Sequence, residues 1–292
     1  MTMNPLEILE LDAWDPPAAS VARAADALES GKVLFLPRLH FSLEADETRF
    51  LSPDWSNGKA KNISYDPVRA TVSGTDAPDA DRAAIAAMMG RYARQARALV
   101  ERISPRYASH LLIGRTSFRP VEITGRASSV TKDDTRLHVD AFVSQPVQGK
   151  RILRVFSNVH PGGRPRTWEV GDGFENLLPR FLPNIPQPLP GSAWLLHRLG
   201  ITKSRRSRYD HIMLHLHDAM KRSVEYQRET AKTRLEFPAG STWAVFTDQV
   251  PHAALAGQFV FEQTFYLPVD AMQNEQFAPL RILEQRLHMA LA

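Results

Sequence analysis

The stretch Leu137-His138-Val139-Asp140, together with a distant Pro251-His252, indicates both the fold and the chemistry of this chain. On an extended strand, the side chains of His138 and Asp140 point to the same face. Two imidazoles and one carboxylate on one face can hold Fe(II) on three adjacent positions and leave the others open. We therefore predict that His138, Asp140 and His252 are metal ligands and catalytic residues. The alternative is that both histidines are ordinary hydrogen-bonded side chains.

The sequence around this motif predicts a β-rich half with helices before, within and after it. Apolar patterns favour strands at 33–36, 111–118, 121–123, 137–140, 151–159, 241–248 and 259–267. Helices are expected at about 18–30, 82–103 (with Asp81 as the cap), 174–181 and 279–291. Short strands that carry a metal motif suit an α+β fold with a double-stranded β-helix, or jelly roll, at its core.

We expect the 292 residues to form a single domain. A mainly helical part (1–105) would precede the β-helix core (106–272), which a helical insertion interrupts at about 173–233. The last element would be the helix at 279–291.

Composition excludes several classes of protein. The chain has no cysteine, which excludes a disulfide scaffold, a thiolate-bound zinc and a cysteine nucleophile. No apolar run approaches the length of a membrane-spanning helix, and the first residues are acidic rather than like a signal peptide. We therefore expect a cytoplasmic protein whose metal is held by nitrogen and oxygen ligands.

The positive charge of the chain is concentrated in one segment. Residues 197–234 contain 10 Lys and Arg against 4 Asp and Glu, whereas the remaining residues contain 26 against 28. Such a segment either faces an anionic partner or is simply solvated.

An α-keto acid is the usual co-substrate of such an iron site, and its outer carboxylate needs a cation. Position 263, eleven residues after His252, is Gln263, which can donate a hydrogen bond but carries no charge. Arg154 lies on the strand that follows the His-x-Asp motif, so we predict that it binds this carboxylate, with Gln263 nearby. Arg151, on the opposite face of the strand, is the reserve, and Arg126 and Thr135 are further candidates for the same pocket.

Several longer stretches also stand out, namely 135–140 (TRLHVD), 151–159 (RILRVFSNV), 209–218 (YDHIMLHLHD), 249–253 (QVPHA) and 262–265 (EQTF). Together they resemble the hydroxylases of Kdo, 3-deoxy-D-manno-oct-2-ulosonic acid, and the likeness extends over about residues 30–270. The resemblance implies an Fe(II)/2-oxoglutarate-dependent dioxygenase that uses O2 and hydroxylates the Kdo sugar of Kdo-lipid A. Hydroxylation would take place at C3 and give Ko in the inner core of lipopolysaccharide.

The basic segment suits such an acidic glycolipid. Arg205, Arg208, His211 and His215 are the candidate substrate-binding residues, and the segment from Lys203 to Arg222 is expected to dock on the anionic inner membrane. An exposed basic helix that is merely solvated is the alternative.

Two other functions remain open from the sequence. The barrel could be a cupin-like metal isomerase or hydrolase, which would not depend on 2-oxoglutarate, or a non-enzymatic module that binds an anionic sugar or lipid. We do not expect a nucleic-acid partner, because the basic segment offers only Tyr209 and Tyr226 for stacking on bases.

Overall fold

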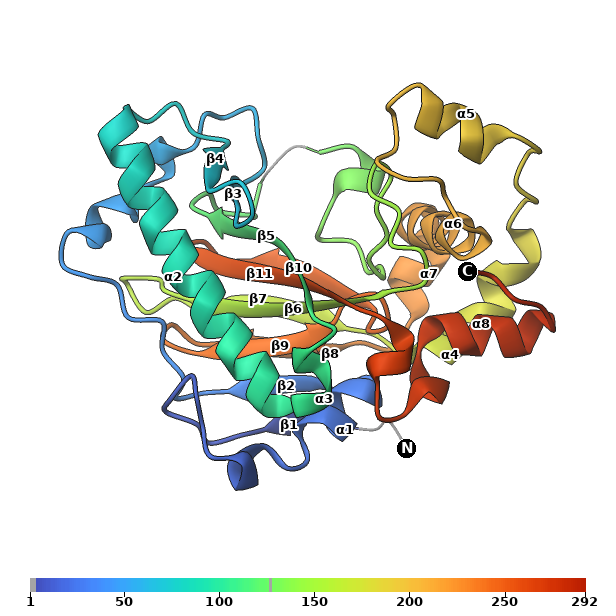
Figure 1. Ribbon diagram of the computed structural model, residues 1–292, viewed down its shortest axis with the longest axis horizontal. Coiled ribbons are helices and arrows are strands. Elements are labelled where there is room, and N and C mark those ends of the chain that lie inside the picture. Colours follow the sequence, from blue (N-terminus) through green and yellow to red (C-terminus); the bar gives the residue numbers. More distant parts are fainter. Residues whose placement is uncertain (1–3, 126–127) are drawn as a thin grey trace.

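The computed structural model describes residues 4–125 and 128–292, and its core is a pair of β-sheets (Figure 1). The larger sheet has eight strands in the order β1-β2-β9-β6-β11-β5-β3-β4, and the smaller sheet has the order β10-β7-β8. The strands are β1 (Leu6–Ile8), β2 (Val33–Leu36), β3 (Ile63–Asp66), β4 (Thr71–Ser73), β5 (Leu112–Arg119), β6 (Arg151–Asn158), β7 (Arg166–Val170), β8 (Thr233–Phe237), β9 (Thr242–Phe246), β10 (His252–Ala256) and β11 (Val260–Leu267).

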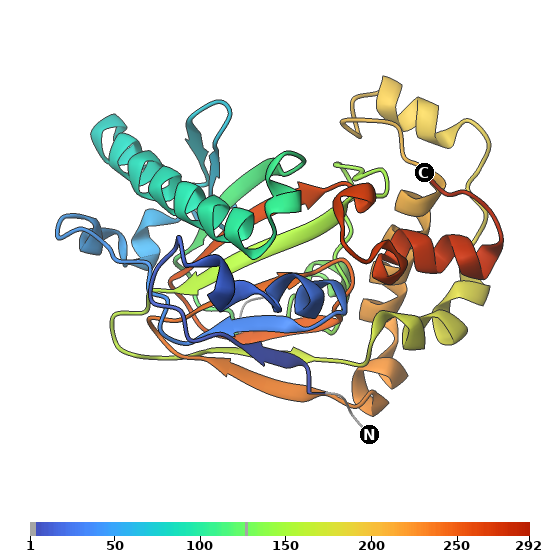
Figure 2. The same ribbon diagram turned by 60° about the horizontal axis from the view of Figure 1, so that its bottom comes forward.

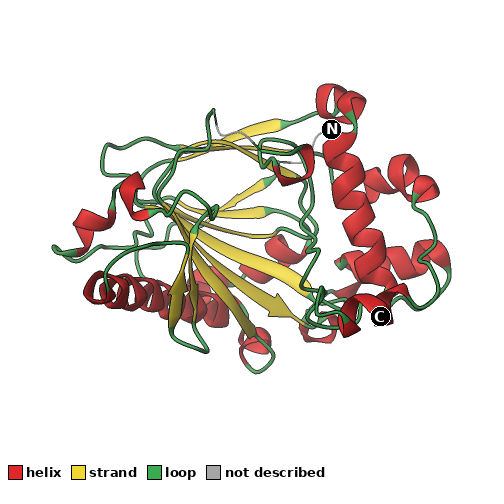
Figure 3. Ribbon diagram, turned by 90° about the horizontal axis from the view of Figure 1, so that it is seen from above, coloured by secondary structure: helices red, strands yellow, loops and turns green. Residues whose placement is uncertain are grey.

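Helices cover the outside of this core and gather beside one end of the sheets (Figure 3). They are α1 (Ala24–Glu29), α2 (Asp79–Ile103), α3 (Pro105–Ala108), α4 (Phe174–Phe181), α5 (Ser192–Arg198), α6 (Arg208–Arg222), α7 (Val224–Glu229) and α8 (Pro279–Leu287). The helices α4 to α7 form the insertion between β7 and β8, whereas α2 crosses the outer face of the larger sheet (Figure 1).

The His-x-Asp segment closes the double-stranded β-helix. His138 and His252 form an isolated antiparallel bridge in which each backbone N–H donates to the other's carbonyl, at 3.0 and 2.8 Å. The segment therefore lies beside β10 and continues the smaller sheet, although the expected strand at 137–140 is reduced to this bridge. The four strands β9-β6-β11-β5 of the larger sheet lie opposite and complete the jelly roll.

The space between the sheets is filled by aromatic side chains at one end and left open at the other. Trp243 stacks on Phe237 and Phe156, with ring centroids 4.1 and 5.2 Å apart, and Trp168 packs edge-on against Trp243. These side chains are buried and form the closed end of the barrel. Their large apolar area supplies much of the free energy that holds the two sheets together.

The structure confirms most of the expected elements, including β2, β6, α4, the helical insertion and β11. Residues 121–123 do not form a strand. α2 begins at Asp79, directly after Pro78, so the expected cap Asp81 lies inside the helix, where it pairs with Arg49. The helix at 18–30 is divided into a 3-10 turn and α1, and α8 ends at Leu287.

The part at 1–105, expected to be mainly helical, contains α1 and the long α2 but also four short strands. β1 and β2 extend one edge of the larger sheet, and β3 and β4 extend the other. β7, β8 and β10 were also absent from the sequence-based prediction. No helix in the described parts of the chain is long and apolar enough to cross a membrane.

Candidate metal centre and active site

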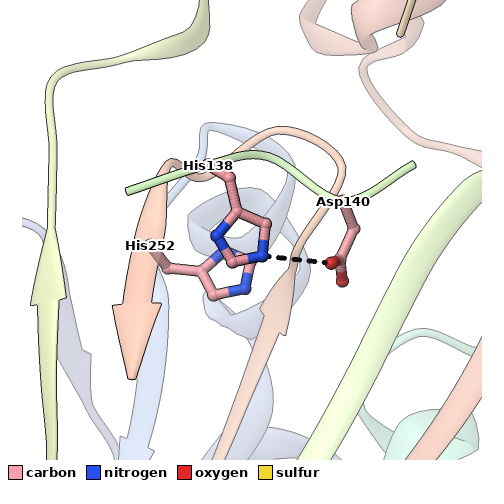
Figure 4. A group of neighbouring side chains, drawn as sticks. All are labelled: His138, Asp140 and His252. Atoms are coloured by element: carbon pink, nitrogen blue, oxygen red, sulfur yellow. Dashed lines mark ion pairs between the residues drawn. The ribbon is translucent and has the colours of Figure 1, made fainter. Parts of the chain in front are cut away.

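His138, Asp140 and His252 come together as the sequence predicts (Figure 4). One ligand atom from each of the three lies within 4.8 Å of the others, and no further group of this kind occurs among the described residues. His138 Nε2 is 3.7 Å from Asp140 Oδ1, and the two imidazole centroids are 4.7 Å apart. The three side chains are buried at the open end of the barrel, which is where a ligand can reach them.

The backbone sets the orientation of both imidazoles. The Nδ1 atom of His138 is 2.7 Å from the carbonyl of Arg136, and that of His252 is 2.9 Å from the carbonyl of Val250. Because a carbonyl can only accept, each Nδ1 carries the proton and leaves Nε2 with a free lone pair facing Asp140. Trp168 stacks on the other side of His252, with centroids 5.0 Å apart, and fixes the ring plane.

The protonation states of the two histidines and of Asp140 also suit metal binding. Burial lowers the pKa of both His138 and His252, so their rings are neutral near pH 7. Burial alone would raise the pKa of Asp140, but Arg154, whose guanidinium lies 3.0 Å from Asp140 Oδ2, and the two histidines hold it below its usual range. The site therefore offers two neutral nitrogens and one carboxylate, a donor set that fits Fe(II) with open positions.

The triad opens into a cavity of about 490 Å³ between the two sheets. Alternate residues of each strand line it, as expected for side chains that share one face. The strand residues are Arg115, Ser117 and Arg119 from β5, Arg154 and Phe156 from β6, Arg166 and Trp168 from β7, and Glu262, Thr264 and Tyr266 from β11. Seven Lys and Arg but only three carboxylates line the cavity, so it favours anionic ligands.

Three arginines form an inner cluster, which we call the arginine cluster: Arg119, Arg154 and Arg166. Arg119 and Arg154 both pair with Glu262, a buried carboxylate whose pKa they hold down against the effect of burial. Arg166 differs, because within the described chain its guanidinium donates to a backbone carbonyl, that of Gly257, at 2.7 Å. Burial and the neighbouring Arg119 lower the pKa of Arg166 to about 9.

The Nε atoms of all three arginines and the indole Nε1 of Trp168 are buried without an acceptor in the described chain. A buried donor without an acceptor is costly, and a buried cation is costly unless an anion is near. The inner end of the cavity therefore fits an additional carboxylate.

The helix α6 closes the opposite side of the cavity. His217 meets the ring of His138 edge-on at 5.3 Å, and Lys221 lies one turn further along the same helix face. Lys221 Nζ is 3.9 Å from Asp134 Oδ1, and Lys61 also pairs with Asp134. The two lysines make this side of the cavity cationic as well.

The remaining sequence-based candidates for the carboxylate site lie elsewhere. Gln263 is on the opposite face of β11 from Glu262 and Thr264, where it bonds with the Thr116 hydroxyl, so it does not reach the cavity. Thr135 is exposed and bonds with Asp133. Arg151 points away from the cavity, because it is fully buried against Asp248. Arg126 lies outside the described residues.

The four proposed substrate residues are also not in the cavity lining. Arg205 is exposed, Arg208 donates to Gln187, and His211 lies 2.8 Å from the carbonyl of Pro186. His215 packs at a tilt against His211 on the outer face of α6, with ring centroids 4.4 Å apart. Contact of these residues with the glycolipid therefore stays a prediction for the surface outside the cavity, whereas His217 and Lys221 line the cavity itself.

Sequence reasoning missed Arg119 and Arg166. A usable signal for Arg119 was the repeat of polar residues Arg115, Ser117 and Arg119, which marks a polar face along β5. Arg166 had no such signal, since β7 follows a Pro- and Gly-rich turn and was not expected to be a strand.

Comparisons with known proteins identify the family of this chain. Residues 13–290 match the family model of 3-deoxy-D-manno-oct-2-ulosonic acid (Kdo) hydroxylase. A crystal structure of the Kdo hydroxylase KdoO, a non-heme Fe(II) α-ketoglutarate-dependent dioxygenase in complex with α-ketoglutarate and Fe(III), is 47% identical with a TM-score of 0.95. The match covers 99% of this chain and 98% of that one.

Two further KdoO structures are similar. The complex with cobalt(II) is 49% identical with a TM-score of 0.95, and the complex with succinate and Fe(III) is 48% identical with a TM-score of 0.94. Each match covers 99% of this chain and 97% of the other. None of the curated proteins matches the chain.

Proposed function

This chain belongs to the Kdo hydroxylase family, and from that membership we propose that His138, Asp140 and His252 hold its iron. The enzyme is a non-heme Fe(II) dioxygenase that depends on 2-oxoglutarate, also called α-ketoglutarate. The observation that carries the assignment is the pair of Nε2 atoms and one carboxylate at the open end of a cationic cavity. When bound, iron and 2-oxoglutarate use O2 to place one oxygen in a substrate C–H bond and the other in succinate, with loss of CO2.

We propose that the arginine cluster binds the outer carboxylate of 2-oxoglutarate. Arg154 remains a candidate, because it lies in the cavity beside Asp140. Arg166 is the stronger one, because it lacks the carboxylate partners that Arg154 already has in Asp140 and Glu262. A bidentate contact with a carboxylate would neutralise the buried charge of the Arg166 guanidinium.

The proposed substrate is the Kdo sugar of Kdo-lipid A, which has a carboxylate of its own. Lys221 and Lys61 both pair with Asp134, which also lies 3.8 Å from Arg119, and the two lysines suit this second acid group. Binding the second acid there would hold the sugar between α6 and the metal ligands. The reaction site that we propose is C3, whose hydroxylation gives Ko.

We also propose that the enzyme works at the cytoplasmic face of the inner membrane, as a peripheral protein. The support is the excess of positive charge in residues 197–234, because cations near an anionic bilayer contribute about 1 kcal/mol each.

The test is turnover of Kdo-lipid A by the purified protein with Fe(II), 2-oxoglutarate and O2. We expect succinate release that depends on Kdo-lipid A and a product that is heavier by one oxygen, with the new hydroxyl placed at C3 by NMR. Asp140→Ala should abolish both, whereas Asp133→Ala, at an aspartate outside the cavity lining, should not. A product hydroxylated at another carbon would contradict the assignment of C3.

A further inference from the structure

Residues 189–201, which include α5, expose an apolar surface that the rest of the fold does not cover. The surface consists of Leu189, Trp194, Leu195, Leu199 and Ile201, and we call it the α5 surface. Leu189 is 77% exposed, Leu199 63% and Trp194 52%, and α5 has no buried residue at all. In Figures 1 and 2, α5 stands at the edge of the molecule, away from the sheets.

The clustering distinguishes this surface from ordinary exposed apolar residues. The described residues include 13 exposed large hydrophobic side chains, and five of them lie within these 13 residues. Single exposed apolar residues are normal on a protein surface, whereas a contiguous group marks an interaction site.

The charge around the α5 surface has one sign. Residues 176–209 contain no Asp or Glu, but they contain Arg180, Arg198, Lys203, Arg205, Arg206 and Arg208. Arg198, Lys203 and Arg205 are exposed. An apolar surface with a basic rim fits a partner that is apolar inside and anionic at its face.

Hydrogen bonds join this segment to the lip of the active-site cavity. The backbone N–H of Lys203 donates to the carbonyl of Ser144 at 2.9 Å, and its Nζ donates to Gln145 at 3.1 Å. Arg206 donates to the carbonyl of Val143 at 2.6 Å. Val143, Ser144 and Gln145 line the cavity, and Val143 is itself an exposed apolar residue. The α5 surface therefore has a fixed position relative to the cavity mouth.

We propose that the α5 surface docks the enzyme on an anionic lipid bilayer by inserting its apolar side chains between the headgroups. Trp194 suits this depth, because its indole has an apolar body and a polar N–H. The proposal rests on the proposed function for the identity of the substrate, and it places the cavity mouth at the lipid surface from which a glycolipid is taken. A second copy of the chain is the poorer occupant, because a symmetric contact would bring two basic rims together.

The experiment is sedimentation with vesicles of phosphatidylcholine, alone or mixed with phosphatidylglycerol. The full chain should bind the mixed vesicles, and the variant Trp194→Ser/Leu195→Ser/Leu199→Ser should bind them on the order of 100-fold more weakly. The matched control Val68→Ser/Val224→Ser removes exposed apolar side chains elsewhere and should bind like the parent. Circular dichroism should show the same fold in all three proteins.

Three outcomes would overturn the proposal. The parent could fail to bind mixed vesicles, or the triple Ser variant could bind them like the parent, which would leave the charges alone responsible. The parent could also be a dimer that binds no vesicles and that the triple Ser substitution makes monomeric. This result would assign the α5 surface to contact with a second copy. Because sedimentation needs no turnover, a parent that binds vesicles but does not hydroxylate Kdo-lipid A would disprove the proposed function and leave the docking intact.

Discussion

Arg154 and Arg166 differ in what their guanidinium groups contact, and this difference separates two roles within one cavity. Arg154 compensates the charge of Asp140 and Glu262, at 3.0 and 2.7 Å, so it supports a proposed metal ligand. Arg166 is buried with a backbone carbonyl as its hydrogen-bond acceptor. Buried charges are normally paired, so an arginine held in this way is expected to await an anionic ligand.

At this scale we predict that Arg166→Ala raises the KM for 2-oxoglutarate by roughly 10- to 150-fold, because a charged hydrogen bond contributes about 1.5–3 kcal/mol. Arg166→Lys, which keeps the charge but loses the two-pronged contact, should have a smaller effect. Arg154→Ala should raise this KM and also weaken metal binding, since Asp140 loses its cation. Steady-state kinetics and metal titration measure the two effects. An unchanged KM in Arg166→Ala with a raised one in Arg154→Ala would return the anchor to Arg154 alone.

At the scale of the element, α6 carries two residue pairs of equal spacing on opposite faces, and one of the pairs lines the cavity. His211 and His215 are four residues apart and share the outer face, and His217 and Lys221 have the same spacing on the inner face. The two pairs are offset by two residues, which is about half a turn. The capping box of Ser207 and Asp210 begins α6, and Asp210 also accepts from Val147 and Gln148, which ties the helix to the loop after the metal segment.

We predict that Lys221→Gln raises the KM for Kdo-lipid A by about 10-fold, because glutamine carries no charge to pair with the acid group of the substrate. The KM for 2-oxoglutarate should not change, since the arginine cluster is untouched. His215→Ala, on the other face of the same helix, is the matched control and should behave like the parent. A larger defect in His215→Ala than in Lys221→Gln would place the substrate on the outer face of α6.

At the scale of the whole molecule, the metal site joins segments that are distant in the chain, so metal binding should stabilise the entire fold. The proposed iron ligands come from the segment before β6 and from β10, which the bridge between His138 and His252 holds together. A ligand that binds only the folded state shifts the unfolding equilibrium by mass action.

We predict that Co(II), at about 100 times its dissociation constant, stabilises the protein by about 2.7 kcal/mol and raises the Tm on the order of 5 °C. A chelator should reverse the shift, and Asp140→Ala should show none, whereas Asp133→Ala should respond like the parent. Differential scanning calorimetry measures the effect. An equal Tm shift in Asp140→Ala would show that cobalt binds elsewhere.

The sequence by itself determined what short-range rules control. Two-residue periodicity placed His138 and Asp140 on one face, and apolar runs located β2, β6 and β11 within a residue or two. The family resemblance was confirmed by the match over residues 13–290. Strand parity put Arg154 and Arg151 on opposite faces of β6, because parity depends only on backbone geometry.

Only the tertiary structure decided which side chains from different strands meet. Arg119, Arg154 and Arg166 come from three strands, and their contacts depend on sheet order and register, which local patterns do not specify. Gln263 lies on the outer face of β11, because β11 presents Glu262 and Thr264 to the cavity. In the same way, packing against the barrel decides which face of α6 points inward. Parity and periodicity give relative faces within one element, whereas long-range packing decides which face is inside.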